Sequence, residues 1–373
     1  MAKIKMDNSF FIYTEKAKTI LIERFHMCTW EFSNDSSLVE FGFEINKDSI
    51  SDEDLTIDLF VPWLTKNCQI QDLYQELSNE ENSRFIFNDS IYNKNSLDGG
   101  SNKTGVIHTF SGRNKLCILP VNFSSQDKIV SAKIRLNEYN EIKKEERPNV
   151  YFRFFIKPKS PYISIRKSGI NKSTIIYDIK INEQRNIPEE LIADFREKSL
   201  CKIKYCFSFN ILPNKYDIVF FDSTSLKNVR SLEYDSFNKY LGKYIEGKSF
   251  KRDELLVVFN KKEVEEYEKK EVAESFSFFS IYSKETIGTG QFAVAILINI
   301  FCGILLFIPT FKKSFNPELK YSQLFPNFSY EIYFALSLAL LTLLYFIWPN
   351  FIWPKIKICF ANLPWEIKNN KVK

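Results

Sequence analysis

Two long apolar runs without a charge, near the end of the chain, constrain the fold more than any other feature. Residues 292–311 read FAVAILINIFCGILLFIPTF, and residues 332–353 read IYFALSLALLTLLYFIWPNFIW. A helix needs roughly 20 apolar residues to cross the ~30 Å hydrocarbon core of a membrane. We therefore predict a C-terminal hairpin of two transmembrane helices. The alternative is a pair of helices buried in a soluble core.

The lysines around these two runs predict how the hairpin is oriented. Lys312, Lys313 and Lys320 lie in the connecting loop, whereas residues 355–373 form a basic tail with five lysines. Lys and Arg are enriched in the loops that stay in the cytoplasm. We therefore predict a multi-pass membrane protein with both termini and the basic tail in the cytoplasm.

A few polar or small residues interrupt the apolar runs. Asn299 and Gly303 are four residues apart in the first run, and Ser337 and Thr342 lie in the second. Polar groups at membrane depth usually face protein or water rather than lipid. These four residues are predicted either to pack the helices together or to line a pore.

Residues 1–258 read mostly as short strands, as in DLTIDLFV, KIVSAKIRL, NVYFRFFIK and LCKIKYCFSF, where apolar and polar residues largely alternate. Helical patterns are fewer and fall at 70–82, 188–198 and 231–245. The predicted fold class is a β-rich α+β soluble region followed by the two-helix transmembrane hairpin. The charged stretch 141–147 is a possible subdivision of this region.

A charged segment, 259–290, separates the β-rich region from the first apolar run. Residues 260–276 read NKKEVEEYEKKEVAESF, which has a high helix propensity and a possible capping box. We predict a helix here, either a solvated spacer or a rigid stalk that transmits a change to the first span. Gly288 and Gly290 would then form a hinge.

Charge and cysteine content limit the partners of the β-rich region. The net charge of +5 lies in residues 292–373, so the preceding residues are neutral overall. An anionic ligand must therefore be held by a local patch. The seven cysteines are odd in number and widely spaced, which favours reduced thiols over disulfides.

Catalytic signals are poor. The chain has only two histidines and lacks the common nucleotide-loop, hydrolase and zinc motifs. His26 and Cys28 are two apart on a predicted strand and could imitate a thiol and its base, but a partly buried strand pair explains them better. We predict no enzyme, no metal site and no cofactor.

The stretch 151–177 has the strongest ligand-binding pattern. It contains six basic residues without an acid, interleaved with aromatic residues. Phosphates need cations and bases need flat partners, so this pattern is typical of a groove for a nucleotide or a single-stranded oligonucleotide. The alternative is a strand pair with an aromatic core face and a basic wet face. The predicted ligand-binding residues are Arg153, Lys157, Lys159, Tyr162, Arg166, Lys167 and Lys172.

The layout of a β-rich region before two membrane spans resembles the membrane effectors of bacterial anti-phage defence systems, including the Hailong-type channel. The resemblance is one of architecture and carries over no residue. It implies a homo-oligomeric channel or membrane-disrupting effector in the bacterial inner membrane, with a role in antiviral defence. The effector would be controlled by a nucleotide or DNA oligomer that a partner nucleotidyltransferase makes. The alternatives are a membrane-anchored binding or scaffold protein whose hairpin is only a tether, and, ranked last, an anchored enzyme.

Overall fold

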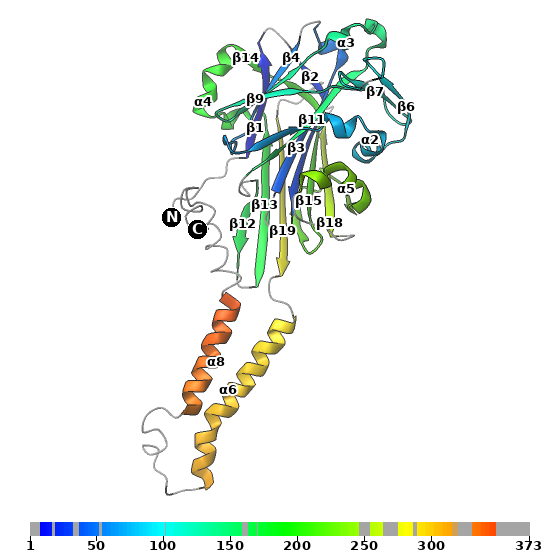
Figure 1. Ribbon diagram of the computed structural model, residues 1–373. Coiled ribbons are helices and arrows are strands. Elements are labelled where there is room, and N and C mark those ends of the chain that lie inside the picture. The colour runs from blue at the N-terminus through cyan, green and yellow to red at the C-terminus, as the bar shows by residue number, and fades with distance from the viewer. Residues whose placement is uncertain are drawn as a thin grey trace, which may run out of the picture. The chain divides into compact units, whose positions relative to one another are not determined.

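The computed structural model describes most of the β-rich region and two helices near the C-terminus (Figure 1). The described residues are 8–16, 19–32, 37–51, 54–100, 102–158, 163–169, 171–245, 254–263, 275–285, 289–315, 318 and 330–347.

Two β-sheets form the framework of the β-rich region. Along the first sheet the strands run β16 (Asp217–Phe221), β19 (Phe276–Glu285), β13 (Lys172–Ile181), β1 (Ser9–Glu15), β4 (Leu55–Phe60), β10 (Ile129–Ile134) and β9 (Asn122–Gln126), with β12 (Ile165–Ser168) beside β13 and β14 (Lys198–Leu200) beside β1. Along the second they run β17 (Leu226–Ser231), β18 (Leu255–Glu263), β15 (Lys202–Pro213), β2 (Leu21–Glu31), β3 (Ser37–Ile45), β11 (Asn149–Lys157), β8 (Leu116–Ile118), β7 (Val106–Phe110) and β6 (Ile91–Ser96), with β5 (Gln69–Asp72) beside β11. The β-rich part of the predicted fold class is confirmed.

The inner faces of the two sheets pack against each other through aromatic side chains. Phe10 of β1 lies 5.7 Å from Phe41 of β3, between ring centroids, and Phe123 of β9 lies 4.6 Å from Phe154 of β11. Successive side chains of a strand point to opposite faces, so every second residue of each central strand enters this core. The side chains at the alternate positions of the second sheet point to its outer face.

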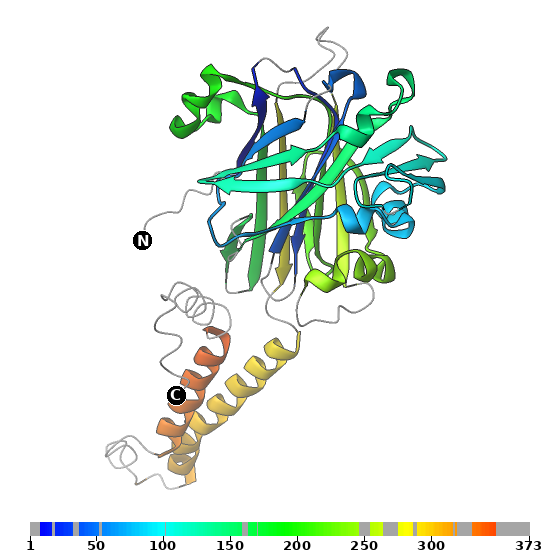
Figure 2. The ribbon, with the colours of Figure 1, turned by 45° about the horizontal axis from the view of Figure 1, so that its top comes forward.

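Short helices cover part of the outer face of the second sheet (Figure 2). Leu77, Phe237 and Tyr240 join Trp30 and Tyr151 of the sheet in one buried apolar cluster. The α-helices of the β-rich region are α1 (Tyr74–Leu77), α2 (Glu80–Phe87), α3 (Asn137–Asn140), α4 (Glu189–Ile192) and α5 (Tyr234–Leu241), and its 3-10 turns are η1 (Lys47–Ser49), η2 (Lys144–Glu146), η3 (Gln184–Asn186), η4 (Asp194–Arg196) and η5 (Gly242–Tyr244).

The helix predicted at 70–82 is replaced by a strand end and two short helices. The side chain of Asp72 accepts a hydrogen bond from the Tyr74 amide at 3.0 Å, and that of Asn79 accepts one from the Glu81 amide at 2.8 Å. Each of these contacts satisfies amide groups at the start of a new helix. Two local side-chain hydrogen bonds within ten residues, the second of them an N-cap, therefore divide the segment that the periodicity predicted as one helix.

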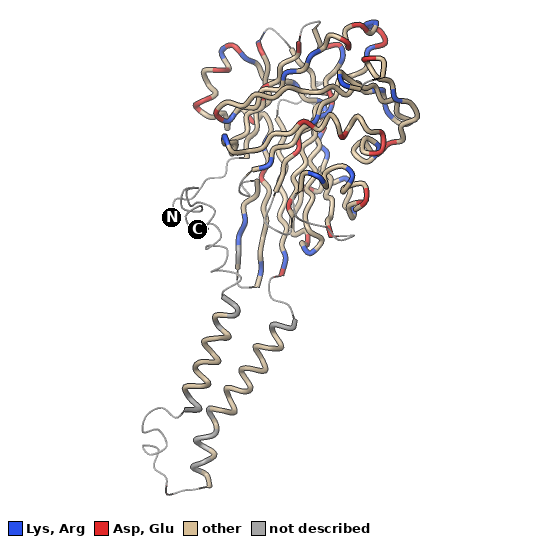
Figure 3. Tube along the Cα trace, in the orientation of Figure 1, with Lys and Arg blue, Asp and Glu red and all other residues tan. Residues whose placement is uncertain are grey.

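The chain forms two compact units, residues 1–165 with 176–282 and residues 166–175 with 283–373. In the second unit, α6 (Thr289–Phe315) and α8 (Tyr330–Ile347) contact each other, with Cys302 Sγ 3.7 Å from the Ala335 carbonyl. The described side chains of both helices include no charge (Figure 3). Large apolar residues such as Leu297 and Leu341 are more than half exposed, at 65% and 62%.

The predicted transmembrane hairpin is contradicted. Within the described part of the chain, neither α6 nor α8 nor any other helix has the length and apolarity needed to cross a membrane. This finding also contradicts the predicted multi-pass location in the inner membrane, the transmembrane helix pair and the ion channel.

The segment predicted as a stalk helix begins as a strand. Residues 260–263 belong to β18 and pair with β15, while residues 264–274 lie outside the described residues. Gly288 also lies outside them, and Gly290 is part of α6. The stretch 141–147 lies within the first unit, where it connects β10 of the first sheet to β11 of the second.

Candidate functional site

The outer face of the second sheet carries an unusual number of polar side chains at its centre. They come from positions that alternate with the core phenylalanines of the same strands, so the pleat alone directs them away from the sandwich core. They are His26 and Cys28 of β2, Glu40 and Glu44 of β3, and Tyr151 and Arg153 of β11.

Gly42 makes room for this group. A Cβ atom at Gly42 would collide with the Tyr151 hydroxyl and would lie 3.3 Å from His26 Nδ1. Those two atoms are themselves 3.1 Å apart and hydrogen-bonded. A glycine in the middle of a strand often marks a close approach, and here it lets the Tyr151 and His26 side chains meet over β3.

A fully buried ion pair lies beside them. Arg153 Nε donates to Glu40 Oε2 at 2.6 Å, and the two side chains are only 4% and 0% exposed. Arg153 also donates to the Tyr151 hydroxyl at 3.2 Å and to Cys28 Sγ at 2.9 Å. The hydroxyl of Tyr240, on α5, donates to Glu40 Oε2 at 3.1 Å. These hydrogen bonds therefore connect α5 to β2, β3 and β11 of the sheet.

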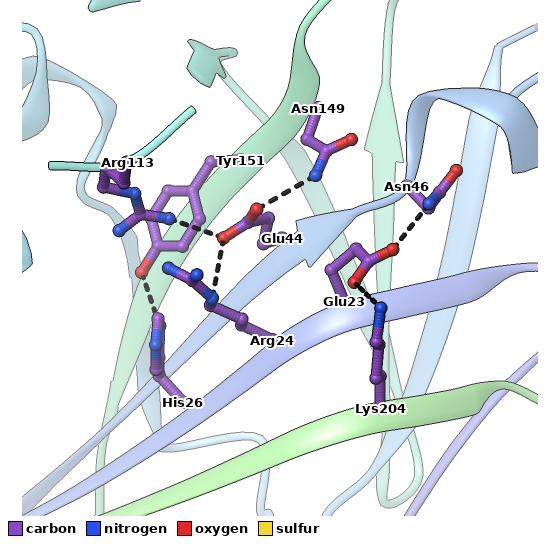
Figure 4. A network of polar contacts seen from close by, with 9 residues as sticks. All are labelled: Glu23, Arg24, His26, Glu44, Asn46, Arg113, Asn149, Tyr151 and Lys204. Carbon is purple, nitrogen blue, oxygen red and sulfur yellow. Dashed lines mark hydrogen bonds and ion pairs between the residues drawn. The ribbon is translucent and has the colours of Figure 1, made fainter. Parts of the chain in front are cut away.

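A second polar group extends toward the edge of this face (Figure 4). Glu44 accepts from Arg113 Nη2 at 2.6 Å and from Asn149 Nδ2 at 3.0 Å, and Arg24 Nε lies 3.8 Å from it. Glu44 is only 6% exposed, whereas the Arg24 side chain is 37% exposed. Arg24 is therefore the cation of this group that reaches solvent.

His26 and Cys28 do not form a catalytic pair. Burial, followed by the charges of Arg153, Arg113 and Arg24, lowers the pKa of His26 well below its usual value, so the ring is neutral at pH 7. Burial raises the pKa of the Cys28 thiol to about 12, and its sulfur accepts a hydrogen bond from Arg153. A neutral thiol turned toward a guanidinium is a poor nucleophile, so the structure explains these residues as packing.

Beyond His26 the same face becomes aromatic and half-buried. We call Tyr205, Phe207 and Phe209 of β15, with Phe259 of β18, the aromatic platform. The Phe259 ring stacks on Phe209 with centroids 4.6 Å apart and planes 5° apart, and on Phe207 at 5.8 Å and 15°. The His26 ring lies 4.9 Å from Phe207 and continues the row. The residues of this row are all partly exposed.

Cationic groups border the aromatic platform. Lys261 Nζ lies 4.7 Å above the Tyr205 ring and 2.6 Å from Glu263 Oε2. Arg24 of β2 pairs with Tyr205 of the neighbouring strand β15, so it lies at the Tyr205 end of the platform. Arg230 of β17 is exposed and pairs with Val257 of β18. Rings with cations at their border can bind flat groups that carry negative charge.

A small cavity of about 70 Å³ opens beside the aromatic platform. His26, Trp30 and Arg153 form part of its wall on the sheet, Phe85 contributes from α2, and Phe209 and Arg230 lie toward the platform. Ligand pockets for whole small molecules are usually ~300 Å³ or larger. The cavity can therefore take only a small part of a ligand whose remainder lies on the aromatic platform.

The structure separates the ligand-binding residues that the sequence predicted. Arg153 is buried and paired with Glu40, and Lys157 Nζ donates to the Tyr244 carbonyl at 3.4 Å. Arg166, Lys167 and Lys172 belong to β12 and β13 of the other sheet and to the other compact unit. Lys159 and Tyr162 lie outside the described residues.

The four residues predicted to pack the apolar helices or to line a pore are all in α6 or α8. Ser337 and Thr342 donate to the carbonyls of Tyr333 and Leu338 in their own helix, at 2.8 and 2.7 Å. Asn299 is exposed. No described atom lies within 4 Å of a Cβ built on Gly303, so among these residues it is not a close contact point between helices.

Sequence reasoning missed the aromatic platform, although its signal is present. In KYCFSFN, aromatic residues recur at every second position, and Cys206, Ser208 and Asn210 fill the positions between them. In the structure those three are buried on the inner face, which leaves the rings outside. A strand with aromatic residues on its outer face and polar residues on its core face is unusual. This pattern could have identified β15 as a candidate binding strand from the sequence.

Comparison of the chain with protein-family models and with curated proteins finds no match. Among the described residues, no group of three or more His, Cys, Asp or Glu side chains has the arrangement of a metal site. The interpretation of the site therefore rests on its own geometry.

The buried pair generates a stability prediction. Arg153→Met leaves the Glu40 charge buried without its partner, which should lower the free energy of unfolding by ~3–5 kcal/mol in urea titrations. Adding Glu40→Leu should recover part of that loss. Lys128→Met, which breaks the exposed Lys128–Glu190 contact, is the control and should cost about 1 kcal/mol or less. Equal losses of unfolding free energy from Arg153→Met and Lys128→Met would contradict the claim that the Arg153–Glu40 pair is buried.

The neutral His26 predicts a pH dependence. Its native pKa lies below that of the unfolded chain, so only the unfolded state gains a proton as pH falls below about 6.5. Stability is lost in that direction, at up to ~1.4 kcal/mol per pH unit. His26→Asn should reduce this slope in urea titrations between pH 6.5 and 5. An unchanged slope would show that His26 takes up a proton in the native state.

Proposed function

We propose that the protein binds a nucleotide or a short single-stranded oligonucleotide on the aromatic platform. The observation that supports this proposal is the row of half-buried rings, with Phe209 and Phe259 stacked at 4.6 Å, on a sheet face bordered by cations. Open sheet faces with exposed rings bind single strands by base stacking, which is worth about 1–3 kcal/mol per base. Such stacking tolerates different base sequences, because every base has a π-face.

The border cations suit phosphates even though some have acidic neighbours. The Lys261 and Glu263 side chains are 27% and 53% exposed, and an ion pair open to solvent contributes about 0–1 kcal/mol. A phosphate can replace the Glu263 carboxylate at little cost. Arg24 is similarly accessible, and its distance of 3.8 Å from Glu44 leaves its guanidinium able to donate to a ligand.

We propose a binding rather than a catalytic role for this face. Its histidine is hydrogen-bonded to Tyr151 and is neutral, and its cysteine is a protonated thiol beside Arg153. Neither arrangement activates a nucleophile. A sensor for a nucleotide or oligonucleotide signal, as the sequence predicted, agrees with these contacts. The role in antiviral defence stays a prediction.

Substitutions on the platform test this proposal. Phe207→Ala and Phe259→Ala should each weaken binding of a fluorescein-labelled eight-nucleotide single strand about tenfold in fluorescence anisotropy, because each removes a stacking partner. Lys261→Glu should also weaken binding. It should reduce the slope of log affinity against log salt concentration by the amount expected for about one phosphate contact.

Two controls locate the site. Lys128→Glu changes an exposed cation in the turn between β9 and β10 of the first sheet. It should leave the affinity within about twofold, because the charge is remote from the platform. Arg166→Glu with Lys167→Glu tests the location predicted from the sequence. If only the latter pair weakens binding, the ligand binds near β12 and the platform proposal is wrong. Absence of binding by any single strand would reject the function itself.

We also propose that the protein self-associates, as the sequence predicted, through β16. This strand is at the end of the described first sheet, and its neighbouring residues Val219 and Phe220 are 52% and 50% exposed. Adjacent residues face opposite sides of a strand, so neither side of this edge is covered there. Phe279 of β19, 42% exposed, contacts Phe220 and enlarges the apolar surface. Edge strands of this kind pair readily with an identical strand.

Light scattering coupled to size-exclusion chromatography tests self-association. The full-length chain should elute as a multiple of its monomer mass, and Phe220→Lys should shift it toward the monomer, because a lysine at the edge opposes pairing. Tyr92→Lys is the control, since Tyr92 is 71% exposed on β6 of the other sheet. A monomeric wild-type chain at all concentrations would overturn the proposal.

A further inference from the structure

The cations that border the aromatic platform gather at its Tyr205 end. Lys261 Nζ lies 4.7 Å from the centroid of the Tyr205 ring, and Lys204 Nζ lies 5.7 Å from it. Arg24 of β2 pairs with Tyr205 across the neighbouring strands. The side chains of Lys261, Lys204 and Arg24 are 27%, 43% and 37% exposed. The ring that begins the platform is therefore flanked by cations that a ligand can reach.

The carboxylates at this end are fewer than the cations. Each of the three cations has one acidic neighbour, which is Glu44 for Arg24, Glu23 for Lys204 and Glu263 for Lys261 (Figure 4). Arg113 is a further cation on Glu44, to which it donates. The pKa of Glu263 is lowered first by its hydrogen bond from Lys261 and also by the charge of Lys227, on β17. Among the described residues, five cations therefore face three carboxylates here, an excess of two positive charges.

Arg24 is the cation of this end whose donors are least used. Its Nε lies 3.8 Å from Glu44, and within the described part of the chain its guanidinium makes no hydrogen bond. Glu44 instead accepts from Arg113 and Asn149. A guanidinium presents several N–H donors in a planar fork whose geometry fits a phosphate. Arg24 can therefore bind a phosphate without losing a hydrogen bond.

The opposite end of the platform is less charged. Beside Phe209 the cavity has apolar side chains such as Val257, and Arg153 in its wall is buried against Glu40. Among the described residues that line the cavity, Arg230 is the exposed cation. The platform therefore has a strongly positive end and a weakly positive end. A ligand whose negative charge is concentrated at one end would match this polarity.

The excess of positive charge also distinguishes between kinds of phosphate. An internal phosphodiester carries one negative charge, whereas a terminal phosphate carries about −1.5 to −2 at pH 7 and has three acceptor oxygens. The charge excess and the unused donors of Arg24 suit the terminal group better. The rings of Tyr205 and Phe207 are 6.5 Å apart between centroids. A base stacked on Phe207 therefore places its own phosphate, one sugar away, beside Tyr205.

We infer that the Tyr205 end of the aromatic platform binds a phosphomonoester, the terminal phosphate of a nucleotide whose base stacks on Phe207. This inference rests on the proposed function and names its substrate class, a ligand with a phosphorylated end. Arg24 donates to the phosphate, and the two lysines beside the Tyr205 ring neutralise its charge. The phosphomonoester can come from the end of a single strand or from a free nucleoside monophosphate.

The test measures the affinity of the full-length protein for eight-nucleotide single strands by fluorescence anisotropy, with the fluorophore on an internal base. Three strands differ only in carrying a 5′-phosphate, a 3′-phosphate or neither. One of the two phosphates should strengthen binding about tenfold, because charge-assisted hydrogen bonds form to that end alone. Competition by an unlabelled nucleoside monophosphate distinguishes a strand end from a free nucleotide as the source of the phosphate.

Two matched variants locate the phosphate. Arg24→Gln should bind the phosphorylated and unphosphorylated strands with affinities within about twofold of each other, because it removes the charge and the fork that the terminal phosphate uses. Arg230→Gln, at the other end of the platform, should weaken both strands by the same factor and keep the difference between them. Lys204→Gln should also reduce that difference, so the test does not depend on the folding of the Arg24→Gln protein.

The other outcomes separate this inference from the proposed function. If all three strands bind equally, or if both phosphates strengthen binding equally, the inference is wrong while the platform proposal stands. If Arg230→Gln rather than Arg24→Gln removes the difference, the phosphate binds at the Phe209 end and the inference is also wrong. Displacement by a nucleoside monophosphate as effective as the strand supports the inference with a free nucleotide as the ligand. If neither strands nor mononucleotides bind, the proposed function fails.

Discussion

The outer face of the second sheet depends on the burial of one ion pair, Arg153 with Glu40. Both side chains are almost completely covered, and removing either partner would leave a charge in an apolar interior. The three donor nitrogens of Arg153 bind Glu40, Tyr151 and Cys28, and Glu40 also accepts from the Tyr240 hydroxyl of α5. The position of α5 on the sheet is thereby linked to the centre of the polar group.

That arrangement divides the outer face into a covered half and an open half. On the side of β11, helices α1, α2 and α5 pack over the sheet and form one apolar cluster with it. On the side of β15 and β18, the rings of the aromatic platform stay half-buried. The cavity with Trp30 and Arg230 lies where the two halves meet. A ligand on the open half can therefore place one group beneath the edge of the covered half.

Much of the β-structure could be predicted, because alternation of apolar and polar residues is a local property. NVYFRFFIK is β11 in the structure, and KIVSAKIRL contains β10. The segment 70–82 was harder, because side-chain hydrogen bonds of Asp72 and Asn79 to nearby amides override helical periodicity. The segment 260–263 has helix-forming residues but extends β18, because pairing with β15 outweighs local propensity.

The candidate site could be predicted only in part, because it is assembled from residues distant in the sequence. Arg153 was expected to bind a ligand, since its basic and aromatic neighbours are visible locally, but its partner Glu40 lies 113 residues away. The residues between 151 and 177 also divide between two sheets, which no local pattern indicates. The two apolar runs predicted membrane spans from length alone, and the described helices contradict that prediction.

The most direct measurement of the central claim is photo-crosslinking of single strands that contain 5-bromouracil to the full-length protein, followed by mass spectrometry of the adducts. Ligand stacking on the aromatic platform predicts adducts within Lys202–Pro213 and Leu255–Glu263, and their loss in the Phe259→Ala protein. Adducts confined to Ile165–Ser168 or to other strands, with none on the platform, would contradict it.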